Sequence, residues 1–300
     1  MINQFLRATI GALLLLASLV PATTAQQGDV TRGIIPDYLK KRPVARRKTA
    51  PPRRGNPRSS NSESSTPADD SNDAAMIGVT VWRVRPASAR DGAEAVRILR
   101  PRPRSARLVQ HVMERIDEGQ PVPVGAALRL GIEVTKSGYL YIIDQEEYAS
   151  GKTGKPVLIF PNIHSADNEV SAGRLIEVPT DPEVDFIVEV SPGQTGEMLT
   201  LMIAPEPLEL KIGPEETTPL DEEKFAEWKT KWGVKTTRLS TGNSFGRPYT
   251  KTEKIAATDR NNPLTREGPL PQTIYQVPAR PGQPLMISLH LQYRENTSPR

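Results

Sequence analysis

Short apolar runs separated by turn residues fill the stretch from Pro121 to Pro207. The first run, Leu128–Val134, carries Leu, Leu, Ile and Val at every second position, with Arg, Gly and Glu between them. Alternation with a period of two is typical of a strand that buries one face. Five more short apolar runs follow before Pro207. The pattern predicts an all-β core and argues against a nucleotide-binding or hydrolase scaffold built on a parallel sheet.

Further strands are expected on both sides of this stretch. The run Tyr139–Ile143 is apolar on both faces, so it predicts a central strand. About nine strands at meander spacing predict a mainly β fold, namely an antiparallel β-sandwich of Ig-like or Greek-key type with one or two short inserted helices. The expected strands are residues 76–82, 128–134, 139–143, 157–160, 174–178, 186–190, 198–204, 208–212 and 285–293.

A helical insert is expected near residues 221–258. Asp221–Trp232 places Phe225, Trp228 and Trp232 on one face, and Gly233 stands where a left-handed residue often ends a helix. This aromatic face is a candidate binding surface for a partner or a membrane. The alternative is that it covers the edge of its own domain.

Other segments give weaker signals. Thr250 and Glu253 form a capping-box pattern that predicts a second helix ending near residue 258. Apolar residues four apart over Leu108–Ile116 indicate a short amphipathic helix. Residues 87–107 are expected to be a loop, and the Pro-rich residues 262–284 are expected to wrap the surface.

The first 25 residues have the pattern of a bacterial export signal. Arg7 precedes an apolar run over residues 10–20, Pro21 ends this run, and small residues lead up to Ala25. The run is shorter than the ~20 residues of a membrane-spanning helix, which favours cleavage after Ala25 over an uncleaved anchor. We therefore expect a secreted or periplasmic protein with no transmembrane helix in the mature chain.

Composition divides the remaining chain into two parts. Residues 26–75 are rich in Pro, Ser and charged residues, so we expect a disordered basic linker there. Residues 76–300 are expected to form a single β-sandwich domain. The chain has no Cys, which excludes disulfides, thiolate nucleophiles and Cys-based zinc sites. The net charge of +4 resides in the linker, because the basic and acidic residues after residue 75 nearly balance.

The basic residues of the linker are a second candidate contact surface. They are suited to hold an anionic surface, such as lipid head groups or an envelope polymer, by electrostatic attraction. Aromatic residues do not alternate with them, so nucleic acid is not expected as a partner. The alternative is a solvated spacer. These residues are Lys40, Lys41, Arg42, Arg46, Arg47, Lys48, Arg53, Arg54 and Arg58.

No metal site and no cofactor are expected. His111, His164 and His290 lack the short spacing that zinc ligands usually show. The acidic residues 181–185 lack the later Gly and Glu of a calcium-binding loop. The tripeptide Gly-Lys-Thr at residues 151–153 lacks the rest of a phosphate-binding loop, so a turn is expected there.

The sequence assigns no catalytic residue. No G-x-S-x-G motif is present, and no spacing of Ser, His and Asp marks a triad. Asp144, Glu146 and Glu147 cluster after a strand, where a solvated turn explains them better than a pair of catalytic carboxylates.

Several segments resemble a known family. Gly138–Asp144, Leu158–Asn162 and Asn168–Pro179 resemble a bacterial exported domain of unknown function, family number 4384, and residues 199–205 and 271–275 are also similar. Members are exported β-domains without an established activity, sometimes fused to caspase-like peptidases or protein kinases. The resemblance therefore implies a β fold and export, but it implies no catalytic residue.

These observations favour a non-enzymatic binding or scaffolding module of the cell envelope that docks through loops or a sheet edge. Its expected partner is a protein or an envelope polymer. One alternative is a hydrolase whose site is built from residues 144–155 and 162–172, for which a cleft joining His164 to a buried carboxylate would be evidence. The other alternative is a structural envelope component that self-assembles.

Overall fold

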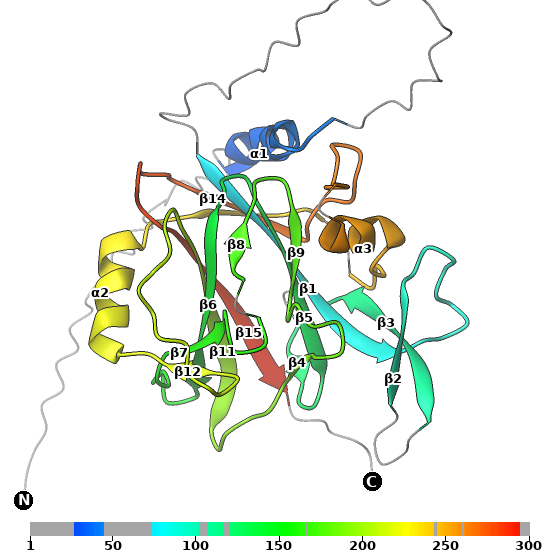
Figure 1. Cartoon of the computed structure of the whole chain (residues 1–300), viewed down its shortest axis with the longest axis horizontal. Coiled ribbons are helices and arrows are strands. Elements are labelled where there is room, and N and C mark those ends of the chain that lie inside the picture. The colour runs from blue at the N-terminus through cyan, green and yellow to red at the C-terminus, as the bar shows by residue number, and fades with distance from the viewer. Residues whose placement is uncertain are drawn as a thin grey trace, which may run out of the picture.

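The computed structural model describes residues 27–44, 74–101, 107–116, 120–165, 167–242, 245–259 and 261–294. The expected export signal and most of the expected linker lie outside these residues. Within them, two β-sheets pack face to face and three helices lie around them (Figure 1). The prediction of a mainly β, sandwich-like fold with short helices is confirmed.

The first sheet is organised around its longest strand, β1. One edge of β1 pairs with β5, and the other edge pairs first with β14 and then with β3. In the described chain the order is β10-β5-β1-β14-β13, with β9 beside β5 and β2 beside β3. The strands are β1 (Ala75–Pro86), β2 (Arg97–Pro101), β3 (Leu108–Arg115), β5 (Ala127–Val134), β9 (Leu175–Val178), β10 (Phe186–Ile187), β13 (Thr237–Ser240) and β14 (Thr273–Val277).

The second sheet has the antiparallel pair β6–β11 at its centre. Its order in the described chain is β12-β7-β6-β11-β15-β4, with β8 also beside β6. Strand β15 pairs antiparallel with β11, and its last two residues pair in parallel with β4. The strands are β4 (Val122–Pro123), β6 (Gly138–Tyr148), β7 (Val157–Phe160), β8 (Glu169–Val170), β11 (Gln194–Ala204), β12 (Thr218–Pro219) and β15 (Leu285–Arg294).

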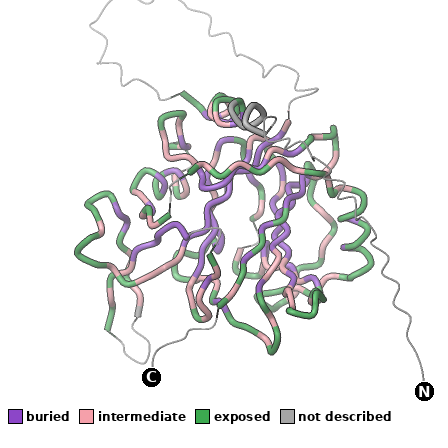
Figure 2. Tube along the Cα trace, turned by 180° about the vertical axis from the view of Figure 1, so that it is seen from behind, coloured by how far each residue is buried: buried purple, intermediate pink, exposed green. Residues whose placement is uncertain are grey.

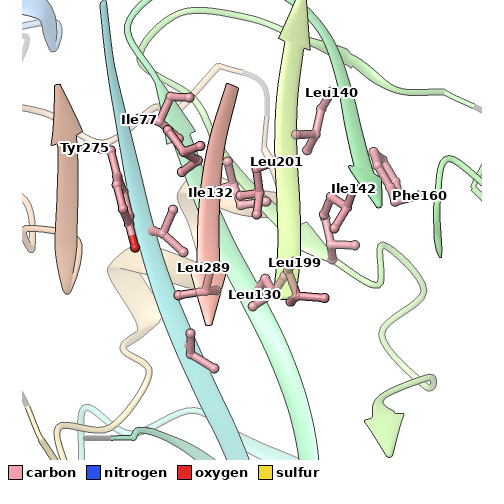
Figure 3. Packing of buried hydrophobic residues seen from close by; sticks show 14 of the residues in the cluster. Ile77, Leu130, Ile132, Leu140, Ile142, Phe160, Leu199, Leu201, Tyr275 and Leu289 are labelled. Atoms are coloured by element: carbon pink, nitrogen blue, oxygen red, sulfur yellow. The ribbon is translucent and has the colours of Figure 1, made fainter. Parts of the chain in front are cut away.

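The main core lies between the two sheets (Figure 3). The period of two in β5 turns its four aliphatic residues inward, as predicted. Strand β6 is central and buried on both faces: Leu140 and Ile142 point into the main core, whereas Tyr141 and Ile143 point to a second core on the outside of the sheet. Figure 2 shows the same concentration of buried residues along the strands.

Helices cover the outer faces of the sheets. Helix α2 (Glu222–Trp232) packs on the second sheet, and Asp221 caps it by accepting a hydrogen bond from the Lys224 backbone at 2.7 Å. Helix α3 (Lys251–Thr258) contacts β9 and has the expected capping box. Among the described helices, none combines the length and apolar character needed to cross a membrane.

One correction concerns the linker, because residues 27–41 form helix α1 (Gln27–Lys41). Ile34 and Tyr38 of α1 are buried against Met76 of β1 and Ile274 of β14. The segment therefore buries apolar side chains on the first sheet, although its average composition is that of a disordered chain.

The helix predicted over residues 108–116 is wrong, because these residues form β3 and pair with β1 and β2. Leu108, Val112 and Ile116 are four residues apart, and an even spacing also places side chains on one face of a strand. The spacing of these residues therefore could not distinguish a helix from a strand.

Other local predictions also differ from the structure. The expected loop 87–107 contains β2, and the Pro-rich stretch contains β14, whose β-branched and aromatic residues form an inner strand of the first sheet. The predicted strand 208–212 is irregular, because the Leu208 N–H donates to the Tyr141 hydroxyl at 2.7 Å rather than to a neighbouring strand. Gly233 has φ −65°, so its predicted left-handed conformation is also wrong.

Candidate binding site

A cavity of about 160 Å³ lies between the two sheets at one end of the sandwich. Both sheets contribute to its wall, and most of its lining is apolar. We call it the end cavity. It is lined by Leu128, Leu130, Asp144, Ile159, Phe186, Ile187, Val188, Glu197, Leu199, Leu291 and Tyr293.

The polar residues of the end cavity are placed there by strand alternation. Along β6 the inward positions run through Leu140 and Ile142 to Asp144, which pairs with Leu199 of β11. Two residues before Leu199, the inward position is Glu197. The inward stripe of β15 ends in the same way, at Tyr293. Three strands thus change from aliphatic to ionisable residues at the same end of the core.

The surroundings of these groups favour their neutral forms. Burial and, to a smaller extent, the nearby carboxyls of Glu197 and Glu146 raise the pKa of Asp144 to about 8. The pKa of Glu197 is also raised by burial, and that of the Tyr293 hydroxyl is raised by burial and by Glu197. The Asp144 Oδ1 atom is buried without a hydrogen-bond partner. No Lys, Arg or His is present among the described lining residues to compensate these acids.

Glu146 lies on β6 two residues after Asp144 of the end cavity. Glu146 accepts hydrogen bonds from the Tyr148 hydroxyl at 2.5 Å and from the Ser191 hydroxyl at 2.8 Å. This contact with Glu146 raises the pKa of Tyr148. The prediction of a solvated turn for residues 144–147 is therefore wrong, because the strand continues to Tyr148 and the turn comes later, at Gly151 with φ +77°.

The described lining of the end cavity lacks the residues of a Ser–His pair. A triad needs a nucleophile beside a base, and the described lining holds neither Ser nor His. His164 lies on an exposed loop 3.9 Å from Glu216 and is not among the residues that line the end cavity with Asp144. In the described part of the chain, no three His, Asp or Glu side chains are grouped as a metal site would require. His290 instead contacts Glu147 at 3.1 Å on the outer face of the second sheet.

The aromatic face of α2 belongs to the second core. Phe225 and Trp228 are 1% and 7% exposed and pack against β6, β7 and β11. Trp232 is half-buried and stacks on Trp228, with ring centroids 5.6 Å apart. The predicted binding surface on Phe225 and Trp228 is therefore wrong, because a helix with so few apolar residues needs them all to hold it on its sheet.

Replacing Trp232 with Ala is expected to lower the free energy of unfolding by roughly 1–2 kcal/mol, because a half-buried ring loses its apolar contacts. Urea unfolding followed by circular dichroism would measure the change. The exposed Glu227 of the same helix provides the control, since Glu227→Ala should change stability by less than about 0.5 kcal/mol. Equal effects of the two substitutions would show that Trp232 contributes nothing to the second core.

Few of the predicted basic contact residues lie within the described residues. The Lys40 side chain is 69% exposed and pairs with Asp37 at 2.8 Å, and Lys41 is half-buried. Arg42 is buried and makes a bidentate ion pair with Glu133 at 2.6 and 2.7 Å, so its assignment to an anionic surface is wrong. The other members lie outside the described residues, and for them the prediction stands untested: Arg46, Arg47, Lys48, Arg53, Arg54 and Arg58.

Comparison with known proteins finds a family match over part of the chain. Residues 122–207 match the family model of a Domain of unknown function (DUF4384). The matched segment runs from β4 to β11 and includes Asp144 and Glu197, whereas β1, β14 and β15 lie outside it. No curated protein and no solved structure matches the chain.

Proposed function

We propose that this protein is a non-enzymatic binding module of the bacterial cell envelope and that the end cavity is its ligand site. The observation that carries the proposal is an apolar cavity between two sheets into which Asp144, Glu197 and Tyr293 converge. An apolar pocket with a few convergent polar groups and shifted pKa values is the usual form of a small-molecule site. The pattern of the first 25 residues supports the location in the envelope.

The size and lining of the end cavity indicate the chemical class of the ligand. A volume of about 160 Å³ is close to the ~150 Å³ of an apolar cavity that accommodates benzene. The polar side of the cavity offers two acids without a cation beside them. A group the size of a phenyl ring that carries an amine satisfies both features, because its ammonium can pair with the carboxylates.

Benzylamine is a suitable probe for this site. We expect it to bind and to shift the methyl NMR signals of Leu130, Leu199 and Leu291, which line the cavity. Binding should strengthen from pH 6 to pH 8.5, because Asp144, with its pKa of about 8, must lose its proton to pair with the ammonium. Benzyl alcohol, which has the same ring without the charge, should show no such pH dependence.

A plugged variant tests whether the cavity itself is the site. Ile187 lines the end cavity and is 54% exposed, so Ile187→Trp places an indole at its mouth with little cost to folding. Ile163 is 51% exposed and lies outside the lining, so Ile163→Trp is the matched control. We expect Ile187→Trp to weaken benzylamine binding at least about tenfold and Ile163→Trp to leave it unchanged. Equal binding by both variants would refute the assignment.

A further inference from the structure

Strand β15 forms an edge of the second sheet along most of its length. Strand β11 occupies one side of β15. The pairing runs from Leu285 opposite Ile203 to Gln292 opposite Gly196. On the other side, the described chain pairs only with Tyr293 and Arg294, through β4. In an antiparallel pair, every second residue of the outer strand directs its N–H and C=O groups away from its partner. The run Leu285–Gln292, about 27 Å long at ~3.4 Å per residue, therefore presents a backbone edge with which no other described strand pairs.

A groove accompanies this edge. Its volume is about 280 Å³, and it lies between β15 and the edge of the first sheet. We call it the lateral groove. Its lining mixes aliphatic and uncharged polar side chains, and Arg238 is its one permanently charged described residue. The lining residues are Val81, Ile116, Gln120, Val122, Arg238, Tyr275, Ser288, Leu289, His290, Leu291 and Gln292.

The edge lacks the usual features that prevent strand pairing. Natural proteins protect edge strands with Pro, Lys, inward charges or bulges. Leu285–Gln292 contains no Pro and no Lys, and its register with β11 is continuous. Ser288, His290 and Gln292 are the exposed residues on its outer face, where Met286 is buried in the second core. At its far end the same edge already accepts a strand, because the Val124 N–H donates to the Arg294 carbonyl at 3.0 Å.

We propose that the β15 edge and the lateral groove bind an extended peptide segment of a partner protein, which adds one strand to the second sheet. Main-chain hydrogen bonds to β15 would supply most of the affinity, as in other cases of strand addition. Alternate side chains of the peptide would enter the groove beside Val81, Leu289 and Leu291. The partner segment therefore carries apolar residues at every second position.

Charge and shape identify the occupant further. Arg238 is exposed on the rim of the groove, where its guanidinium also hydrogen-bonds the neutral Tyr275 side chain, so an acidic residue of the peptide is the complementary choice. A second copy of this chain fits less well, because Leu285–Gln292 contains no Asp or Glu that could pair with Arg238. A partner strand with long apolar side chains uses both the edge and the groove.

A blocked octapeptide, Ac-Val-Thr-Val-Thr-Asp-Thr-Val-Thr-NH₂, is the probe for this proposal, because strand alternation places its Val and Asp side chains on the groove side. We expect it to bind the protein with a Kd of about 1 mM or tighter and, at about ten times its Kd, to slow hydrogen exchange of the outward-facing β15 amides about tenfold. The same peptide N-methylated at every second amide keeps its side chains but loses edge hydrogen bonds, so it should not bind. Binding of the methylated peptide with equal affinity, or no binding of the parent peptide at 1 mM, would overturn the proposal.

A charge exchange tests the role of Arg238. Arg238→Glu should weaken binding of the Asp peptide about tenfold and should strengthen binding of a peptide with Lys at the same position. Arg280 is also exposed and lies outside the groove lining, so Arg280→Glu is the control and should change neither affinity. Analytical ultracentrifugation of the wild-type chain tests the other candidate occupant, a second copy of the chain, by measuring the oligomeric state. A dimer in which the β15 amides are protected without peptide would overturn the proposal in favour of a second copy.

Discussion

Replacing Glu133 with Ala is expected to lower the free energy of unfolding by about 3–5 kcal/mol, because it leaves a buried guanidinium without its counter-ion. The side chains of Arg42 and Glu133 are 1% and 3% exposed. Arg42 also donates to the backbone carbonyls of Gly268 and Pro269, at 3.1 and 2.9 Å, and lies over the Tyr38 ring. One ion pair therefore joins helix α1, strand β5 and the segment that leads into β14.

The double variant Arg42→Met/Glu133→Leu distinguishes loss of the pair from loss of one partner. Because this change removes both charges and keeps apolar volume, we expect it to recover most of the stability lost in Glu133→Ala. The exposed pair Asp37–Lys40 lies on the same helix, and Asp37→Ala should cost less than about 1 kcal/mol. Urea unfolding of the full mature chain measures all three variants. A cost for Glu133→Ala as small as that of Asp37→Ala would contradict the described packing of Arg42.

The second large effect concerns pH. The pKa of Asp144 is raised from 3.8 to about 8 in the folded protein. Between these values the folded state binds more protons than the unfolded state, so stability falls as the pH rises from about 4 to about 8. Glu197, whose pKa is also raised, contributes in the same direction. The wild-type protein should therefore be more stable at pH 5 than at pH 9.

Asp144→Asn removes the Asp144 part of this dependence. We expect the variant to match the wild type near pH 5, where Asp144 is protonated, and to be more stable by roughly 2 kcal/mol at pH 9. This free-energy difference is well below the value obtained by converting the whole pKa shift of Asp144 into free energy, because the side chain keeps some contact with solvent. Thermal unfolding at pH 5, 7 and 9 measures it. Glu209 is exposed outside the end cavity, so Glu209→Gln should show no such difference. If Asp144→Asn gave equal shifts at all three pH values, Asp144 would not be a buried acid.

Two central strands could be predicted from sequence, because β5 alternates apolar and polar residues and the run of β6 is apolar on both faces. The predictions of a strand at Leu128–Val134 and of a central strand at Tyr139–Ile143 match β5 and β6. The helix starts predicted from Asp221 and Thr250 are also correct. Burial of the outer face of β5 was not visible, since Arg129 and Glu133 have the appearance of solvent-facing residues. Both are buried by partners far away in the sequence: Arg129 by residues 179–185 and Glu133 by Arg42.

The end cavity could not be predicted for a related reason. Asp144 and Glu197 lie on different strands, and only the register between β6 and β11 brings them to the same end of the core. The sequence shows a cluster at residues 144–147, and charged residues after an apolar run usually indicate a turn. A signal was present nevertheless, because Asp144 continues the inward alternation of Leu140 and Ile142.

Helix α1 also decides how the protein should be produced. Composition places the start of the domain at Met76, and a recombinant chain trimmed to that residue would appear to keep every strand. It would lack Tyr38 and Arg42, so Glu133 would remain as a carboxylate beneath an uncovered apolar patch at Met76 and Ile274. Such a fragment is expected to precipitate or to expand at neutral pH. Expression should therefore begin at Gln26, the first residue after the expected cleavage, so that the protein keeps helix α1 and Arg42.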